Sequence, residues 1–228
     1  MNTSLIQAAA QRSNLGARYA ILAVLVLAMA LTRINHFAPL PDASWAVFFA
    51  GGFYLRKNLP WAFALLMIEA VFVDYAVITG QGQSFWDHYC VSAAYWFLVP
   101  AYLAMWYGGA LLAANYRGLD ARTFGLACAS FLVALVVCYL VSNGSFYWLS
   151  ASVPAPRSIG AWMKNLGDWF LPYLRSQGAY FGVAVAVHAV IASLAKRCVV
   201  QCETTKGAFL VQRALPLAPY PSTVAALQ

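Results

Sequence analysis

Charged residues are scarce in this chain. Only 9% of its 228 residues are Asp, Glu, Lys or Arg, against about a quarter in an average soluble domain. Hydrophobic residues make up 63%, and several apolar runs approach the roughly 20 residues that cross a bilayer as a helix. The chain also lacks a glycine-rich phosphate loop, which argues against nucleotide hydrolysis. The composition therefore predicts an all-α, polytopic membrane protein in contact with the lipid bilayer.

Cysteine is also sparse. The five cysteines have no spacing typical of a zinc site or of a secreted disulfide framework. Cys90 is the only cysteine expected at the outer membrane face, where a mixed disulfide would have no resolving partner, so a disulfide oxidoreductase is disfavoured.

The apolar runs predict six membrane helices. We expect them at about residues 19–32, 45–55, 59–78, 90–114, 124–141 and 169–195. The second run is too short to cross a bilayer by itself, and Gly51 and Gly52 within it allow close backbone contact. The pattern predicts one membrane domain over residues 18–196, preceded by a cytoplasmic segment (1–17) and followed by a loose cytoplasmic tail (197–228).

The basic residues predict the orientation. Counted by alternate connectors, one side holds Arg12, Arg18, Arg56, Lys57, Arg117, Arg122, Lys196, Arg197, Lys206 and Arg213, and the other holds Arg33, Arg157, Lys164 and Arg175. By the positive-inside rule both termini are cytoplasmic, and the connectors 33–44, 80–89 and 142–168 face outward. Topology explains the net charge of +7 better than a nucleic-acid partner does, so none is expected.

The stretch GQGQSFWDHYCVSAAY, residues 80–95, is the strongest candidate for a binding site. It places aromatic rings, a carboxylate, an imidazole and a thiol in the six positions from Phe85 to Cys90, a combination that favours a ligand pocket. The alternative is an interfacial aromatic belt with a structural cysteine. Glu69 and Asp74 lie in the helix before it, and carboxylates inside a membrane usually face a partner or a wet cavity. Asp74, nearer Gly80, could line the pocket.

Two segments, RINHFAPLPDASWAVFFAGGFYLR and DYAVITGQGQSFWDHYCVSAAYWFLVPAY, resemble the BtuM type of the substrate-binding S components of energy-coupling-factor vitamin transporters. The resemblance covers roughly residues 18–196 and implies a six-helix protein of the bacterial inner membrane that takes up cobalamin. It implies that Cys90 ligates the corrin cobalt, with Tyr95 as the following tyrosine of the motif. The alanines at 20, 23, 28 and 30 miss the Ala-xxx-Ala spacing that S components use for docking, so coupling to an energising module is not expected.

The hypothesis that follows is a cobalamin importer in which the Cys90 thiolate ligates cobalt and helps to remove the upper axial ligand. Its further candidate contacts are Asp42, Asp87, His88, Tyr89, Tyr95, Tyr147 and Trp148. Two alternatives stay open. One is a membrane enzyme with Cys90 as nucleophile and His88 as base; the other is a structural membrane protein that binds no ligand.

Overall fold

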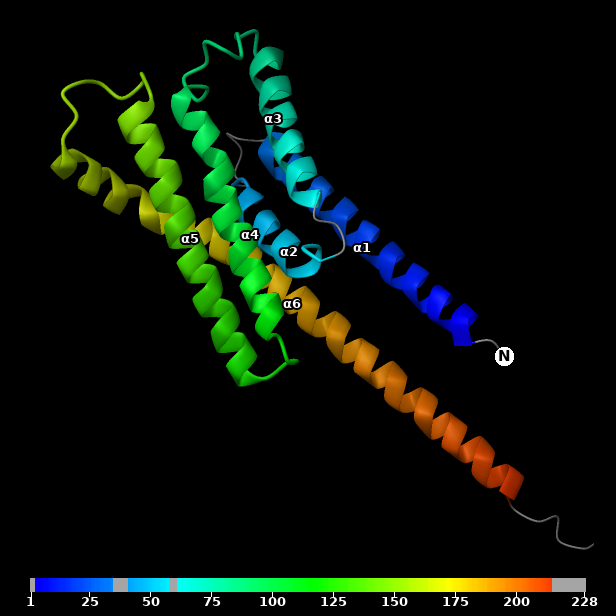
Figure 1. The fold of residues 1–228 in the computed structure, drawn as a ribbon. Coiled ribbons are helices and arrows are strands. Elements are labelled where there is room, and N and C mark those ends of the chain that lie inside the picture. Colours follow the sequence, from blue (N-terminus) through cyan, green and yellow to red (C-terminus); the bar gives the residue numbers. More distant parts are fainter. Residues whose placement is uncertain (1–2, 35–40, 58–60, 215–228) are drawn as a thin grey trace, which may run out of the picture. The chain divides into compact units, whose positions relative to one another are not determined.

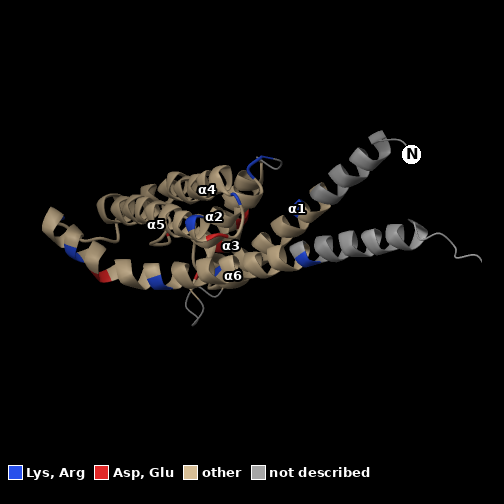
Figure 2. Ribbon diagram, turned by 90° about the horizontal axis from the view of Figure 1, so that it is seen from below, with Lys and Arg blue, Asp and Glu red and all other residues tan. Residues whose placement is uncertain are grey.

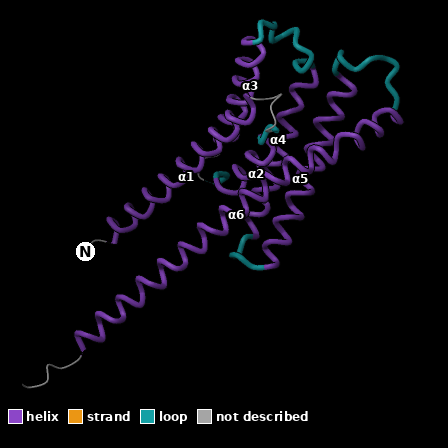
Figure 3. The backbone as a smooth tube through the Cα atoms, turned by 180° about the vertical axis from the view of Figure 1, so that it is seen from behind, coloured by secondary structure: helices purple, strands orange, loops and turns teal. Residues whose placement is uncertain are grey.

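The computed structural model describes residues 3–34, 41–57 and 61–214, and the side chains of residues 15–34, 41–57, 61–195 and 197. Within these ranges the backbone forms helices and connecting loops and contains no strand (Figure 3). The prediction of an all-α fold is confirmed.

Six α-helices and one 3-10 helix make up this described part of the chain (Figure 1). In order they are α1 (Thr3–Ile34), α2 (Ser44–Tyr54), α3 (Ala62–Gly80), η1 (Ala93–Phe97), α4 (Leu98–Asn115), α5 (Ala121–Leu149) and α6 (Ile159–Ala214). Five segments are long and apolar enough to cross a membrane, namely Leu15–Ile34, Ala62–Gly80, Ala93–Asn115, Ala121–Leu149 and Ile159–Ala195. The chain is therefore a multi-pass membrane protein.

The surface of these helices suits lipid. Lys, Arg, Asp and Glu occupy little of the ribbon (Figure 2), and large apolar side chains point outward. Ile68 and Phe72 on α3 are 66% and 68% exposed, and Val133 on α5 is 64% exposed. In water such a surface would be an aggregation hazard, whereas in a bilayer it faces hydrocarbon.

The predicted outer connector 142–168 is wrong in extent. α5 continues to Leu149 and α6 begins at Ile159, so the loop is limited to residues 150–158. The polar residues that suggested a loop instead join the two helices: Asn143 Nδ2 donates to Asn165 Oδ1 at 2.8 Å, and Trp162 Nε1 donates to Asn143 Oδ1 at 3.2 Å. Tertiary hydrogen bonds override the weak helix propensity of Asn, Ser and Gly here.

The ends of three other helical segments also differ from the prediction. The predicted helix over residues 90–114 begins as η1 at Ala93, where the Ser92 hydroxyl accepts the Ala94 N–H at 3.3 Å, so Cys90 lies in the loop of residues 81–92. Helix α1 begins at Thr3, within the segment predicted to precede the membrane domain. The tail predicted to be loose is helical as far as Ala214, and residues 215–228 lie outside the described part.

Helix α6 takes part in two compact units of the chain, one ending at Ala184 and the other beginning at Val185. In the first unit it runs antiparallel to α5. Trp162 meets Asn143 near the α5 C-terminus, and the Phe181 ring stacks on Phe131 at 4.2 Å. In the second unit, residues 185–214 continue as helix.

Helix α2 has only 11 residues, and eight of them are buried, so protein rather than lipid surrounds it. It runs alongside α4 in the same direction. The Phe48 ring stacks on Tyr102 at 4.5 Å near the start of both helices, and Phe53 meets Tyr116 at 5.5 Å near their ends.

The backbones of α2 and α4 touch at two glycines. A Cβ added at Gly52 would overlap the Trp106 carbonyl oxygen, and a Cβ at Gly109 would overlap the Phe49 carbonyl oxygen. Small residues are required where membrane helices approach this closely.

Gly52→Ala and Gly109→Ala should each destabilise the protein, because neither backbone can move away without disturbing the α2–α4 interface. We expect a loss of about 1–3 kcal/mol in the free energy of unfolding, the usual cost of overpacking. The matched control is Gly125→Ala in α5, where a Cβ meets nothing within 4 Å, and where the higher helix propensity of Ala should leave stability unchanged or raise it. Denaturant titration in detergent measures all three; equal effects would contradict the close contact.

Candidate functional site

The polar centre of the membrane domain is built around Arg33 in the last turn of α1. Its side chain is only 4% exposed. Nε and Nη2 donate to the two carboxylate oxygens of Asp74, both at 2.7 Å, which is the two-point geometry that a guanidinium makes with a carboxylate. Nη1 donates to Asp42 Oδ2 at 2.9 Å, Ser44 Oγ at 2.9 Å and the Tyr102 hydroxyl at 3.2 Å. The cation is fully paired, as burial demands.

Asp42 joins this cluster from the segment before α2. Its Oδ1 accepts the backbone N–H of Ser44 at 2.9 Å and the Ser44 hydroxyl at 2.6 Å, which fixes the first residue of α2. Gln177 of α6 holds the same segment, since its Nε2 donates to the Asp42 carbonyl at 2.6 Å and its Oε1 accepts the Ala46 N–H at 3.3 Å. Asp42 is thus an ion-pair partner and does not line the hollow described below.

Tyr95 connects the cysteine-containing loop to the same cluster. Its hydroxyl donates to Asp74 Oδ2 at 2.7 Å. Phe85, at the other end of the loop, is 6% exposed and packs against Tyr75 and Tyr95 at ring distances of 5.5 and 6.1 Å. The loop between α3 and η1 is therefore anchored on both sides of Cys90.

Cys90 is half-buried in this loop. Burial raises the pKa of its thiol; the hydrogen bond with the Tyr89 side chain and the charge of Arg33 lower the pKa, while the charge of Asp74 raises it. The thiol is therefore mostly protonated at neutral pH. Because both members of the Arg33–Asp74 pair act on it, Cys90 lies within electrostatic reach of the buried cluster.

His88 is placed to order the backbone of the loop. Its Nδ1 accepts the N–H of Cys90 at 3.3 Å, and its ring lies 4.4 Å from that of Tyr89. This imidazole nitrogen is committed to the backbone rather than to the thiol.

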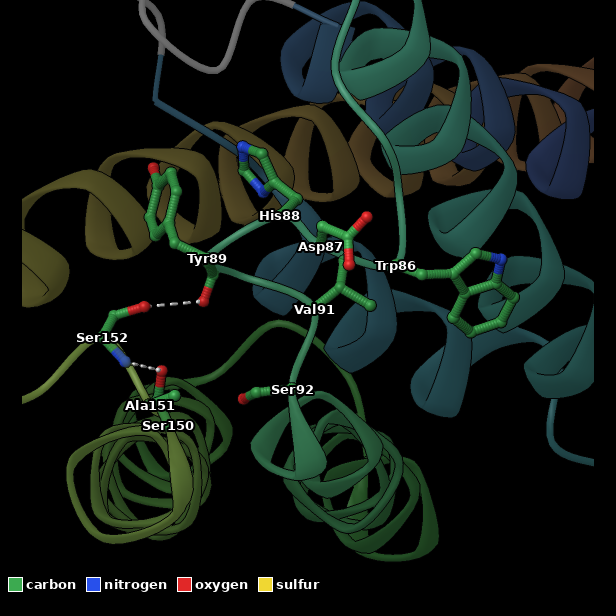
Figure 4. A pocket seen from close by; sticks show the side chains of 9 residues that line it. All are labelled: Trp86, Asp87, His88, Tyr89, Val91, Ser92, Ser150, Ala151 and Ser152. Carbon is green, nitrogen blue, oxygen red and sulfur yellow. Dashed lines mark hydrogen bonds between the residues drawn. The ribbon is translucent and has the colours of Figure 1, made fainter.

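A hollow of about 350 Å³ opens beside the loop. It is lined by Trp86, Asp87, His88, Tyr89, Val91, Ser92, Ser150, Ala151 and Ser152 (Figure 4). The two loops that form it are tied together, because the Ser152 hydroxyl donates to the Tyr89 carbonyl at 3.3 Å. The hollow brings together the candidates Asp87, His88 and Tyr89. The Cys90 side chain is not part of its lining.

Tyr147 and Trp148 lie at the base of the second loop. The buried Tyr147 hydroxyl donates to the Ser158 carbonyl at 3.1 Å and accepts the Ser158 N–H at 3.2 Å. Trp148 packs edge-on against Tyr147 and Trp162, and its carbonyl accepts Arg157 Nη1 at 2.6 Å. Tyr147 and Trp148 therefore stabilise the loop that forms one wall of the hollow. Neither side chain lines the hollow itself.

The central position of Arg33 is the main feature that the sequence did not reveal. From the sequence alone, Arg33 is interpreted as a flanking cation at the end of an apolar run. One sequence feature could have indicated its ion pairs: Asp42 and Asp74 are predicted at the same membrane face as Arg33, and an intramembrane cation usually pairs with such carboxylates. Tyr102 and Gln177 carry no such signal, because nothing in their local sequence marks them as polar contacts.

Arg33→Leu should destabilise the protein strongly, because it leaves the half-buried Asp42 and Asp74 without their cation. Breaking one side of a buried pair costs about 3–5 kcal/mol, a loss that unfolding in detergent would measure. The control is Lys164→Leu, which removes an exposed pair with Asp168 (side chains 76% and 55% exposed) and should change stability little. An Arg33 variant as stable as the control would contradict the ion-pair assignment.

Neither a protein family model nor a curated protein matches the chain.

Proposed function

We propose that this chain is a bacterial inner-membrane protein that binds cobalamin or its precursors at the outer face and imports them, with the Cys90 thiolate as a ligand of cobalt. The observation that carries the proposal is the loop of residues 81–92, which holds a half-buried thiol next to a hollow lined in part by Trp86 and Tyr89. Thiolate is a soft ligand, and transition metals such as cobalt accept it.

The anchoring of the loop supports this role. Tyr95 is fixed on Asp74 and Phe85 is packed into the bundle, so the thiol between them is held in place before a ligand arrives. Preorganisation lowers the entropic cost of binding. The hollow is at the small end of ligand pockets, so a corrinoid would extend beyond it over the exposed rings of Trp86 and Tyr89, which are 73% and 51% exposed.

A six-pass topology with both termini in the cytoplasm fits the helix directions. Arg18 of α1 donates to the Tyr54 carbonyl at the end of α2 at 3.4 Å, whereas Arg33 meets Asp74 near the end of α3. Helices α1, α2 and α3 therefore alternate in direction, as the proposed topology requires. The carboxylates of Asp42 and Asp74 offset the charge of Arg33, which weakens the positive charge of the proposed outer face further.

Ligation also suggests a chemical step with cyanocobalamin. The Cys90 sulfur donates an electron pair to Co(III) and forms the S–Co bond, while the Co–CN bond breaks and cyanide leaves with its electron pair. The thiol proton ends on cyanide as HCN. No electron is transferred to or from the metal, so no reductant is required.

The alternative in which Cys90 is the nucleophile of an enzyme and His88 its base is less well supported, because His88 Nδ1 accepts the Cys90 backbone N–H. We also propose that import proceeds without an energising module, since the first helix lacks the Ala-xxx-Ala docking pattern.

Purified protein from cells grown with cobalamin should show a corrin absorption band that changes in position or occupancy in Cys90→Ser. The matched control is Cys128→Ser, which removes an exposed thiol in α5 and should leave the band unchanged. A colourless wild type that also fails to take up added cobalamin would overturn the proposal.

Affinity for aquocobalamin should rise with pH over the acidic to neutral range. The bound form requires thiolate, while burial keeps the free Cys90 thiol protonated by raising its pKa. Each binding event therefore releases one proton, so affinity should rise about tenfold per pH unit below the thiol pKa. Equilibrium titration measures this slope. The Cys90→Ser variant should show no such slope, and a flat wild-type profile would argue against thiolate ligation.

A further inference from the structure

Three parts of the chain meet at the end of the bundle away from the cysteine-containing loop. Arg18 precedes Arg33 by about four turns of α1, and it donates to the Tyr54 carbonyl at the end of α2 at 3.4 Å. The Phe53 ring meets that of Tyr116, the residue after α4, at 5.5 Å. The lower part of α1, the end of α2 and the α4–α5 connector therefore lie together.

Four further cations flank these contacts. Arg56 and Lys57 lie in the turn after α2, Arg117 lies in the α4–α5 connector, and Arg122 lies in the first turn of α5. Lys57, Arg117 and Arg122 are exposed. None of the four makes a salt bridge or a side-chain hydrogen bond with another residue that the structure describes. Together with Arg18 they form the basic cluster of this end.

The basic cluster is not neutralised by the chain itself. Among the described acidic residues, Asp120 lies at this end, and its carboxylate caps α5 by accepting the Thr123 N–H at 2.6 Å. The hydrogen bonds from Thr123, together with the charges of Arg122 and Arg117, lower the pKa of Asp120. One carboxylate leaves four of the five positive charges uncompensated.

Three cations near the opposite end of the bundle do have partners within the chain. Arg33 is paired with carboxylates, Arg157 donates to backbone carbonyls, and Lys164 pairs with Asp168. The basic cluster lacks such internal partners and is therefore available to anions outside the chain.

Aromatic side chains place the basic cluster at the depth of the lipid headgroups. Tyr19, next to Arg18, packs its ring on that of Trp61 at 6.5 Å. The two side chains are 48% and 47% exposed, and Trp61 directly precedes α3. Half-exposed Tyr and Trp at the ends of membrane helices are typical of the membrane–water interface. The neighbouring cations thus lie at the level of the lipid phosphates.

We infer that the basic cluster binds the headgroup phosphates of anionic phospholipids. Guanidinium groups pair with phosphate oxygens at two points, and basic sites between membrane helices bind anionic headgroups. Leu111 near the end of α4 and Phe124 near the start of α5 are 57% and 58% exposed, so acyl chains have an apolar surface beside the cations. This surface favours a lipid over a free phosphate ion.

The inference is independent of cobalamin binding, because it uses the end of the bundle away from Cys90. With the orientation proposed above, the basic cluster faces the cytoplasmic leaflet, where anionic lipids attract basic segments. That agreement rests on the proposed topology, whereas lipid binding itself does not.

Equilibrium titration of the full chain in detergent, with phosphatidylglycerol and with phosphatidylcholine of the same acyl chains, tests the inference. The wild type should prefer phosphatidylglycerol, and Arg56→Gln and Arg117→Gln should each lower this preference about fivefold. Arg117→Lys keeps the charge and should retain most of the preference. The matched control is Lys164→Gln, which removes an exposed cation from the other end and should leave the preference unchanged.

Equal affinity of the wild type for the two lipids, or an equal loss in Lys164→Gln, would overturn the inference. Excess inorganic phosphate should leave phosphatidylglycerol bound, and displacement would instead assign the cluster to a free anion. If the Gln variants fail to fold, the salt dependence of the wild type decides. Its preference should fall as salt rises, because salt screens exposed charges, and a preference that ignores salt would refute binding by the cations.

Discussion

The buried Arg33 holds four parts of the chain together at one end of the bundle. A guanidinium that is 4% exposed at a membrane helix end must be paired on all sides. Its partners come from α3, from the segment before α2, from α2 itself and from α4. Each of these elements is therefore held at one end of the bundle, where the cysteine-containing loop begins.

In the apolar body of the bundle, side-chain size rather than charge pairing decides how closely the helices pack. There the helices have no charges to pair, and contact is limited by side-chain size, so α2 and α4 meet through Gly52 and Gly109. This close contact buries an 11-residue helix, too short to span a bilayer by itself, inside the protein. The two kinds of contact act together. Gly52 and Gly109 let α2 pack against α4, and Asp42 and Ser44 bind the start of α2 to Arg33.

Local sequence was sufficient for some features and insufficient for others. The extent of α2 was close to the prediction, because Asp42 precedes it, Ser44 begins it, and Arg56 and Lys57 follow it. The grouping of Asp87, His88 and Tyr89 around one hollow was also predictable, since they are consecutive. The Arg33–Asp74 pair joins residues 41 positions apart, and no local pattern encodes such a contact. The helical course of residues 142–149 was missed for the same reason, because Asn143 is satisfied only by α6.

A thiol, a hollow and a buried ion pair lie at one end of the membrane bundle, and the proposed function makes this thiol a ligand of cobalt. X-ray absorption at the cobalt edge of the protein–cobalamin complex tests that assignment most directly. If Cys90 ligates cobalt, the wild-type complex should have a sulfur atom in the first coordination shell, and a lighter atom should replace it in Cys90→Ser. A wild-type cobalt coordinated by nitrogen and oxygen alone would contradict it.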